Sequence, residues 1–156
     1  MQSLTEVYRC EIDPQWVDYN AHLNDGYYAL IFSLAGEGLF EALGLGAQWR
    51  DEMQRTIFTL DVRTRYLREV HAGSTLSIRA QLLDWDSRRM HFLLYMFVDG
   101  DSVVRATSEQ VVMCIDPQVT RAAAFDSAAQ QRIAALLELH RDAKKPVTVG
   151  RPLGLR

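Results

Sequence analysis

Cysteine is scarce in this chain, and so are long apolar runs. Cys10 and Cys114 are the only cysteines among 156 residues, and without a C-x-x-C spacing they indicate neither a disulfide framework nor a zinc site. No window approaches the roughly 18 apolar residues of a membrane span. Met1 to Glu6 lack the basic and then apolar layout of a signal peptide. We therefore expect a cytoplasmic protein with no membrane partner.

An excess of positive charge is also missing. The formal net charge is -3, which gives no reason to expect a nucleic-acid partner. The content of 48% hydrophobic and 24% charged residues is ordinary for a globular protein. The length of 156 residues suits one domain that buries roughly two-thirds of its unfolded surface. We expect a single domain over residues 1–156.

The most informative segment runs from Val17 to Tyr28, where an aspartate, a histidine and an asparagine stand close together. Asp18 and His22 are four residues apart, and Asn24 follows two residues later, in a segment rich in turn-forming residues. This pattern predicts a helix entry. A carboxylate there suits the unpaired N–H groups at a helix start, where an anion or a developing oxyanion can bind. Simple capping is the alternative interpretation.

Apolar residues recur at spacings of three and four from Tyr27 to Leu43, and this predicts one long helix. The helix carries few charges, so we expect it to be enclosed on most sides. A second helix is predicted from Asp126 to the residues before Pro146. The tail from Val147 onward is expected to be flexible or to contact a partner.

Strand-like runs surround the long helix in the sequence. One short run, 7–12, precedes the helix, and four longer runs follow it, separated by turn signals. Their partial alternation of polar and apolar residues is typical of a sheet with one covered face. We expect the four later runs to form an antiparallel meander around the helix; they are 56–67, 74–84, 89–98 and 102–115.

This layout resembles the hotdog fold, and residues 5–119 resemble a hotdog thioesterase of the 4-hydroxybenzoyl-CoA thioesterase type. In that family an Asp-x-x-Gly-His-x-Asn-Asn-x-x-Tyr motif precedes the helix. Asp18, His22, Asn24 and Tyr28 match its Asp, His, first Asn and Tyr, whereas Ala21 replaces the glycine. The sequence departs from the family pattern further along as well. Asp25 replaces the second asparagine, and Ser33, Leu34 and Gly36 stand where a Glu and an Arg are common.

The resemblance implies an α+β hotdog fold in which an antiparallel sheet wraps around one long central helix, with a second, C-terminal helix and tail in residues 120–156. It implies a thioester hydrolase with an acyl-CoA substrate, CoA being part of that substrate and no cofactor being needed. Hotdog proteins of this type pair into dimers or dimers of dimers. The motif spelling is most similar to thioesterases of carnitine breakdown, which hydrolyse betainyl-CoA.

The candidate catalytic residues are Asp18, His22 and Asn24. Asp18 would attack the thioester carbonyl or activate a water, and the sequence leaves both routes open. Backbone N–H groups of residues 25–27 would polarise the carbonyl oxygen. His22 and Asn24 would orient substrate or water, or only satisfy backbone groups. Glu37 in the long helix is a second candidate base.

Aromatic residues crowd the motif and are candidates for substrate binding, because their faces attract quaternary ammonium groups. The candidates are Trp16, Tyr19, Tyr27 and Tyr28. Core or dimer-contact aromatics are the alternative. The remaining histidines, His71, His91 and His140, have no metal-ligand spacing, so no metal is expected. Five arginines could meet CoA phosphates or simply face solvent; they are Arg63, Arg65, Arg68, Arg88 and Arg89.

Two other functions fit the same sequence. One is a hotdog hydrolase of another acyl-CoA or of an acyl carrier protein, or a dehydratase, although the spacing of Asp18 and His22 does not favour a dehydratase. The other is a module that binds acyl-CoA without turnover and keeps the loop only as a helix cap. Fold alone does not decide between them.

Overall fold

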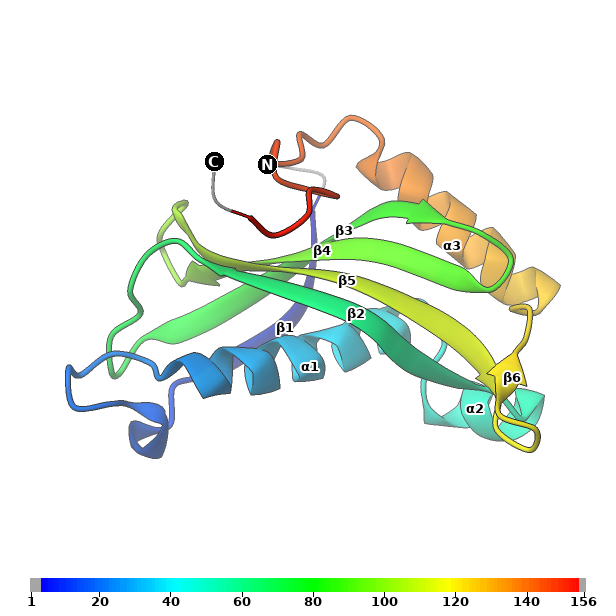
Figure 1. The fold of residues 1–156 in the computed structure, drawn as a ribbon, viewed down its shortest axis with the longest axis horizontal. Helices are drawn as coiled ribbons and strands as arrows, with labels where there is room; N and C mark the ends of the chain where they lie inside the picture. The colour runs from blue at the N-terminus through cyan, green and yellow to red at the C-terminus, as the bar shows by residue number, and fades with distance from the viewer. Residues whose placement is uncertain (1–3, 155–156) are drawn as a thin grey trace.

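A curled antiparallel sheet wraps around one long helix in the computed structural model, which describes residues 4–154 (Figure 1). The predicted α+β hotdog fold is confirmed. Residues 1–3 and 155–156 of the expected domain lie outside the described residues. The elements are β1 (Thr5–Glu11), η1 (Pro14–Trp16), α1 (Asp25–Ala42), α2 (Ala47–Met53), β2 (Thr56–Tyr66), β3 (Thr75–Trp85), β4 (Arg89–Val98), β5 (Val104–Asp116), β6 (Arg121–Ala122) and α3 (Ser127–His140).

The strand order is β1-β3-β4-β5-β2, with the short β6 paired to β5, and all pairings are antiparallel. The predicted meander is therefore right for β3, β4 and β5 and wrong for β2, which pairs with β5 instead of β3. The physical reason is that α1 crosses the concave face between β1 and β2. The strands on either side of this crossing consequently lie at opposite edges of the sheet.

Bulges curl the sheet around α1. Each of the four long strand pairings contains one shift of register, and such shifts increase the local twist and bend of a sheet. On the concave side, Ile31, Ala35 and Leu39 of α1 are fully buried. Gly38 lies so close to β1 that an added Cβ would meet the Val7 carbonyl oxygen at 2.0 Å. A glycine is required at this contact.

One side of α1 remains uncovered by the chain itself. Leu30 is 43% exposed and Leu34 is 39% exposed. The expectation that the helix is enclosed on most sides is therefore wrong for this face. The edge strand β2 also exposes apolar side chains, among them Phe58, Leu60 and Val62.

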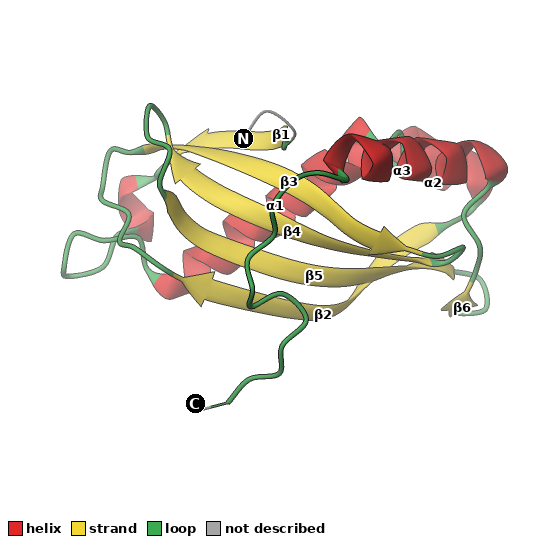
Figure 2. Ribbon diagram, turned by 90° about the horizontal axis from the view of Figure 1, so that it is seen from above, coloured by secondary structure: helices red, strands yellow, loops and turns green. Residues whose placement is uncertain are grey.

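The outer face of the sheet is covered by α3 and by the C-terminal segment, which crosses it after α3 (Figure 2). Val149 packs against Leu93, Tyr95 and Phe97, and the Gly150 N–H donates to Glu109 Oε1 at 2.8 Å. The described part of the tail is thus attached to its own sheet, contrary to expectation. Among the described helices, none crosses a membrane alone by length and composition; only α1 and α2 together, bent by 64°, pass that test.

Candidate active site

The loop before α1 is fixed by backbone pairing on both sides. The Asp18 N–H donates to the His22 carbonyl at 2.8 Å, and the Leu23 N–H donates to the Val70 carbonyl at 2.8 Å. His22 also forms an isolated antiparallel bridge with His71. Ala21 closes the turn with a φ of 60°, which is the left-handed conformation that favours glycine. This left-handed conformation explains why the family motif has a glycine at this position.

Asp18 is half-buried, and one of its carboxylate oxygens is already engaged. Oδ1 accepts from the backbone N–H of Asn20 at 2.8 Å and from that of His22 at 3.3 Å. These contacts fix the orientation of the carboxylate while Oδ2 carries no such bond among the described residues. Asp18 lines a cavity, so an oriented carboxylate oxygen is available to a ligand there.

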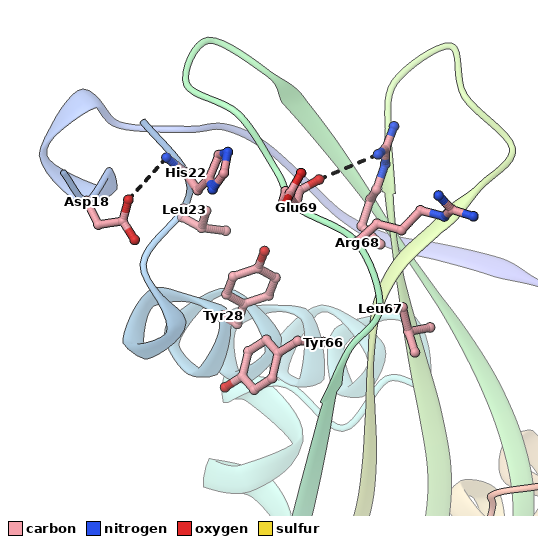
Figure 3. A pocket seen from close by; sticks show the side chains of 9 residues that line it. Asp18, His22, Leu23, Tyr28, Tyr66, Leu67, Arg68 and Glu69 are labelled. Carbon is pink, nitrogen blue, oxygen red and sulfur yellow. Dashed lines mark hydrogen bonds between the residues drawn. The ribbon is translucent and has the colours of Figure 1, made fainter. Parts of the chain in front are cut away.

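The cavity has a volume of about 570 Å³ and opens to solvent (Figure 3). It lies between the loop before α1 and the segment that follows β2. Carboxylates and guanidinium groups both reach it, so it suits a ligand with charge of both signs. Its lining comprises Asp18, His22, Leu23, Tyr28, Tyr66, Leu67, Arg68, Glu69 and Arg105.

Two tyrosines form the floor of the cavity. Tyr28 lies in the first turn of α1 and is 4% exposed, and its ring meets that of Tyr66 edge-on with centroids 5.0 Å apart. Burial raises the pKa of Tyr28 above its ordinary value. The Tyr28 hydroxyl consequently stays protonated at neutral pH and can donate a hydrogen bond to a carbonyl oxygen.

The start of α1 has fewer free donors than the sequence implied. The Asn24 side chain caps the helix by accepting from the Gly26 N–H at 3.0 Å, and the Tyr27 N–H donates to the Asn24 carbonyl at 3.0 Å. Two of the three expected backbone donors are thus engaged by the cap. The Tyr28 hydroxyl is a better placed donor toward the cavity.

The structure brings together some of the predicted site residues and separates others. Asp18, His22 and Tyr28 line the cavity, whereas Asn24 caps α1 outside the lining. Trp16 stacks on Tyr27 with centroids 5.5 Å apart, away from this lining. Tyr19 is also outside it and is 96% exposed. The substrate-binding roles of these three aromatics stay predictions.

Other candidate residues lie elsewhere. Glu37 is exposed on α1, where it pairs with Arg50 at 3.3 Å, and it does not line the cavity. Glu69 and Arg105 were missed by sequence reasoning, because only the tertiary pairing of residues 22–23 with 70–71 brings that region to Asp18. Tyr66, at the end of β2, joins the cavity through its contact with Tyr28, as an aromatic arriving from a neighbouring element. No local motif marks these residues in the sequence.

Comparison with known proteins identifies the class. The family model of the thioesterase-like superfamily matches residues 12–133, so the chain belongs to this superfamily and is a thioester hydrolase by class. It is 36% identical to a betainyl-CoA thioesterase of Pseudomonas aeruginosa, over 99% of this chain and 98% of that protein. It is 26% identical to an L-carnitine dehydrogenase/betainyl-CoA thioesterase of a Rhizobium species, of which it spans 29%.

Solved structures show the same fold over nearly the whole chain. A Staphylococcus aureus protein in complex with CoA has a TM-score of 0.90 at 25% identity, covering 98% of this chain and 96% of that one. A thioesterase candidate from Pseudomonas putida KT2440 has a TM-score of 0.84 at 32% identity, covering 98% and 97%. The similarity extends through α3 and is not limited to the core.

Proposed function

We propose that this thioester hydrolase converts betainyl-CoA and water to glycine betaine and CoA, in the cytoplasm and as a step of carnitine catabolism. The observation that carries the proposal is the oriented Asp18 carboxylate beside the buried Tyr28 hydroxyl in one cavity. The near full-length similarity to the Pseudomonas aeruginosa enzyme supports the choice of acyl group. The reaction needs no cofactor, since CoA enters as part of the substrate.

Asp18 has two ways to perform the hydrolysis. Its free oxygen can attack the thioester carbonyl, which expels the CoA thiolate and leaves an anhydride that water then opens. Alternatively, it takes a proton from a water as that water adds to the carbonyl. In both routes the Tyr28 hydroxyl donates to the developing oxyanion. The thiol has a reference pKa near 8.5 and leaves without a strong acid.

Glu69 and Tyr66 provide recognition of the acyl cation in this proposal. A trimethylammonium group has no N–H to donate, so a protein recognises it by negative charge and by aromatic faces. Glu69 brings a carboxylate to the cavity that already contains the Tyr28 and Tyr66 rings. Both Asp18 and Glu69 act electrostatically on the Tyr28 hydroxyl, so the two carboxylates flank the same space.

A homodimer is part of the proposal, and pairing of two such dimers is compatible with it. The edge strand β2 exposes apolar side chains, with Phe58 at 46%, Leu60 at 51% and Val62 at 49%. The exposed Leu30 and Leu34 of α1 extend the same apolar character. Pairing β2 with β2 of a second copy would satisfy the strand edge and cover these residues.

Release of free thiol from a panel of acyl-CoAs tests the proposal. The panel contains betainyl-CoA, 4-hydroxybenzoyl-CoA and straight-chain acyl-CoAs, with an acyl carrier protein thioester as a separate substrate. We expect the highest kcat/KM for betainyl-CoA. Hydrolysis of other thioesters only would contradict the acyl assignment and retain the enzyme class. Binding without any thiol release would favour the non-catalytic module.

A further inference from the structure

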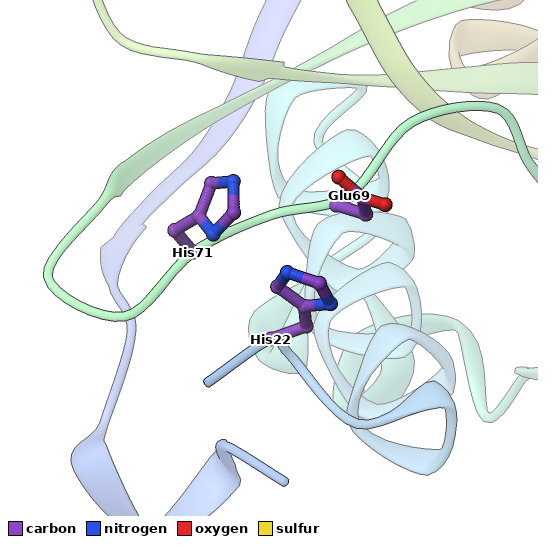
Figure 4. A group of neighbouring side chains, drawn as sticks. All are labelled: His22, Glu69 and His71. Carbon is purple, nitrogen blue, oxygen red and sulfur yellow. The ribbon is translucent and has the colours of Figure 1, made fainter. Parts of the chain in front are cut away.

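Three side chains with metal-binding chemistry gather at the rim of the cavity (Figure 4). His22 comes from the loop before α1, whereas Glu69 and His71 come from the segment after β2. One ligand atom of each residue lies within 4.8 Å of those of the other two. The two imidazole rings meet edge-on with centroids 4.7 Å apart.

The backbone holds these residues in place. His22 and His71 form a β-bridge, and hydrogen bonds from Leu23 N–H to the Val70 carbonyl and from Ala72 N–H to the Ala21 carbonyl flank it at 2.8 and 3.3 Å. Residues directly opposite in such a pair have neighbouring Cβ atoms.

The alternating directions of side chains along residues 69–71 place Glu69 and His71 on the same side of the chain. Val70 is fully buried, so Glu69 and His71 on either side of it point away from the core, because successive side chains of an extended segment face opposite ways. The three groups therefore share one side of two paired segments.

We propose that His22, Glu69 and His71 form a binding site for a divalent transition-metal ion. Two imidazoles and one carboxylate are a known zinc ligand set that leaves a coordination position open to water. Imidazole suits Zn²⁺, Ni²⁺ and Co²⁺, whereas Mg²⁺ and Ca²⁺ prefer oxygen ligands. The expected ion is therefore of the first group.

Occupancy of this site should inhibit the enzyme. His22 and Glu69 also line the Asp18 cavity, so a bound dication would place positive charge where the cationic acyl group is proposed to enter. The inhibition rests on the proposed function, but metal binding does not. Metal and betainyl-CoA are expected to exclude one another, which gives competitive inhibition.

Calorimetric titration of the untagged, full-length protein with Ni²⁺ tests the site. We expect the wild type to bind one ion per chain. In His71→Ala the affinity should fall by more than about tenfold, since mutating even the hydrogen-bond partner of a metal ligand typically lowers metal affinity 10- to 100-fold. His91→Ala is the matched control and should bind as the wild type does, because His91 lies in another cluster with Glu109. No binding, or equal binding in His71→Ala, would overturn the site.

The same variants separate the site from the enzymatic activity. His71 is outside the cavity lining, so His71→Ala should hydrolyse substrate normally without metal and resist Ni²⁺ inhibition. Loss of thioester absorbance over the first few turnovers is the suitable readout, because the product thiol itself binds metals. Equal inhibition of the wild type and His71→Ala would contradict the inhibitory role. Failure to hydrolyse betainyl-CoA would leave the calorimetric result intact.

Discussion

Ala21 shows how one residue departs from its family while the loop keeps its shape. Its φ of 60° is left-handed, a conformation that disfavours residues with a Cβ. The backbone N–H and carbonyl of Ala21 are engaged with Asp18 and Ala72, so the turn cannot relax without losing the loop. The loop therefore keeps its shape with local backbone strain at Ala21.

Ala21→Gly should stabilise the protein by about 0.5 to 1 kcal/mol, because glycine removes the strain at the cost of some extra freedom in the unfolded chain. Urea unfolding measures the change. Ala29→Gly is the matched control, since Ala29 is exposed within α1 and glycine there should destabilise by about 1 kcal/mol. A variant at position 21 no more stable than the wild type would contradict the account of the turn.

Glu69→Gln should weaken recognition of the substrate's positive charge and leave recognition of its shape unchanged. The neutral isostere of betainyl-CoA is 3,3-dimethylbutyryl-CoA, in which carbon replaces the ammonium nitrogen. We expect kcat/KM for betainyl-CoA to fall about tenfold, on the order of one screened charge contact, and that for the isostere to stay unchanged. Glu11→Gln, at an exposed position at the end of β1, is the control. An equal loss for both substrates would assign Glu69 a structural role.

At the scale of elements, local pattern identified the long strands and the helices α1 and α3. It missed the short α2 and β6, and it did not identify which strands are neighbours. The run 89–98 matches β4 residue for residue, and α1 begins two residues before the predicted helix. Alternation and helical spacing are local properties, so they suffice for this. The partner of β2 depends on how α1 crosses the sheet, and no residue within β2 encodes that crossing.

His140 docks α3 onto the sheet and makes this contact dependent on pH. Its Nδ1 accepts from the Leu82 N–H at 2.9 Å, and its Nε2 lies 3.1 Å from Thr5 Oγ1. Burial lowers the pKa of His140. The unfolded chain, with a histidine pKa of about 6.5, therefore takes up the proton first, and stability should fall as pH drops below about 6.5.

Denaturant unfolding at about pH 7.5 and pH 5.5 checks this dependence. The wild type should lose stability on acidification, and His140→Gln should start less stable but lose less between the two pH values. His91→Gln serves as the comparison, because His91 is a partly buried histidine elsewhere on the sheet, with its Nε2 at 2.9 Å from Glu109 Oε1. Identical losses for the wild type and His140→Gln would show that another group controls the acid sensitivity.

At the scale of the whole molecule, the predictable part of the site is the part that is contiguous in sequence. Asp18, His22 and Tyr28 lie within one motif, and all three line the cavity. Glu69 reaches the cavity because a β-bridge between His22 and His71 joins two distant segments, which no spacing rule could reveal. The proposed recognition of the acyl cation by Glu69 depends on this tertiary pairing, so the motif alone does not identify Glu69.

The assembly is likewise a property of the whole molecule. Leu60→Asp should convert the proposed dimer to a monomer, because it places a charge in the middle of the exposed β2 edge. Size-exclusion chromatography with light scattering measures the mass. Val119→Asp, at a position that is 60% exposed near β6, should leave the dimer intact. A monomeric wild type, or an unaffected Leu60→Asp dimer, would contradict the proposed interface.

The most direct measurement compares betainyl-CoA hydrolysis by the wild type and Asp18→Asn. Asparagine Oδ1 can accept the same two backbone N–H groups, so the variant should keep its fold, with a melting temperature close to that of the wild type. We expect rapid hydrolysis by the wild type and a loss of about 10²-fold or more in the variant. A folded variant that retains most of the rate would show that Asp18 is not the catalytic carboxylate.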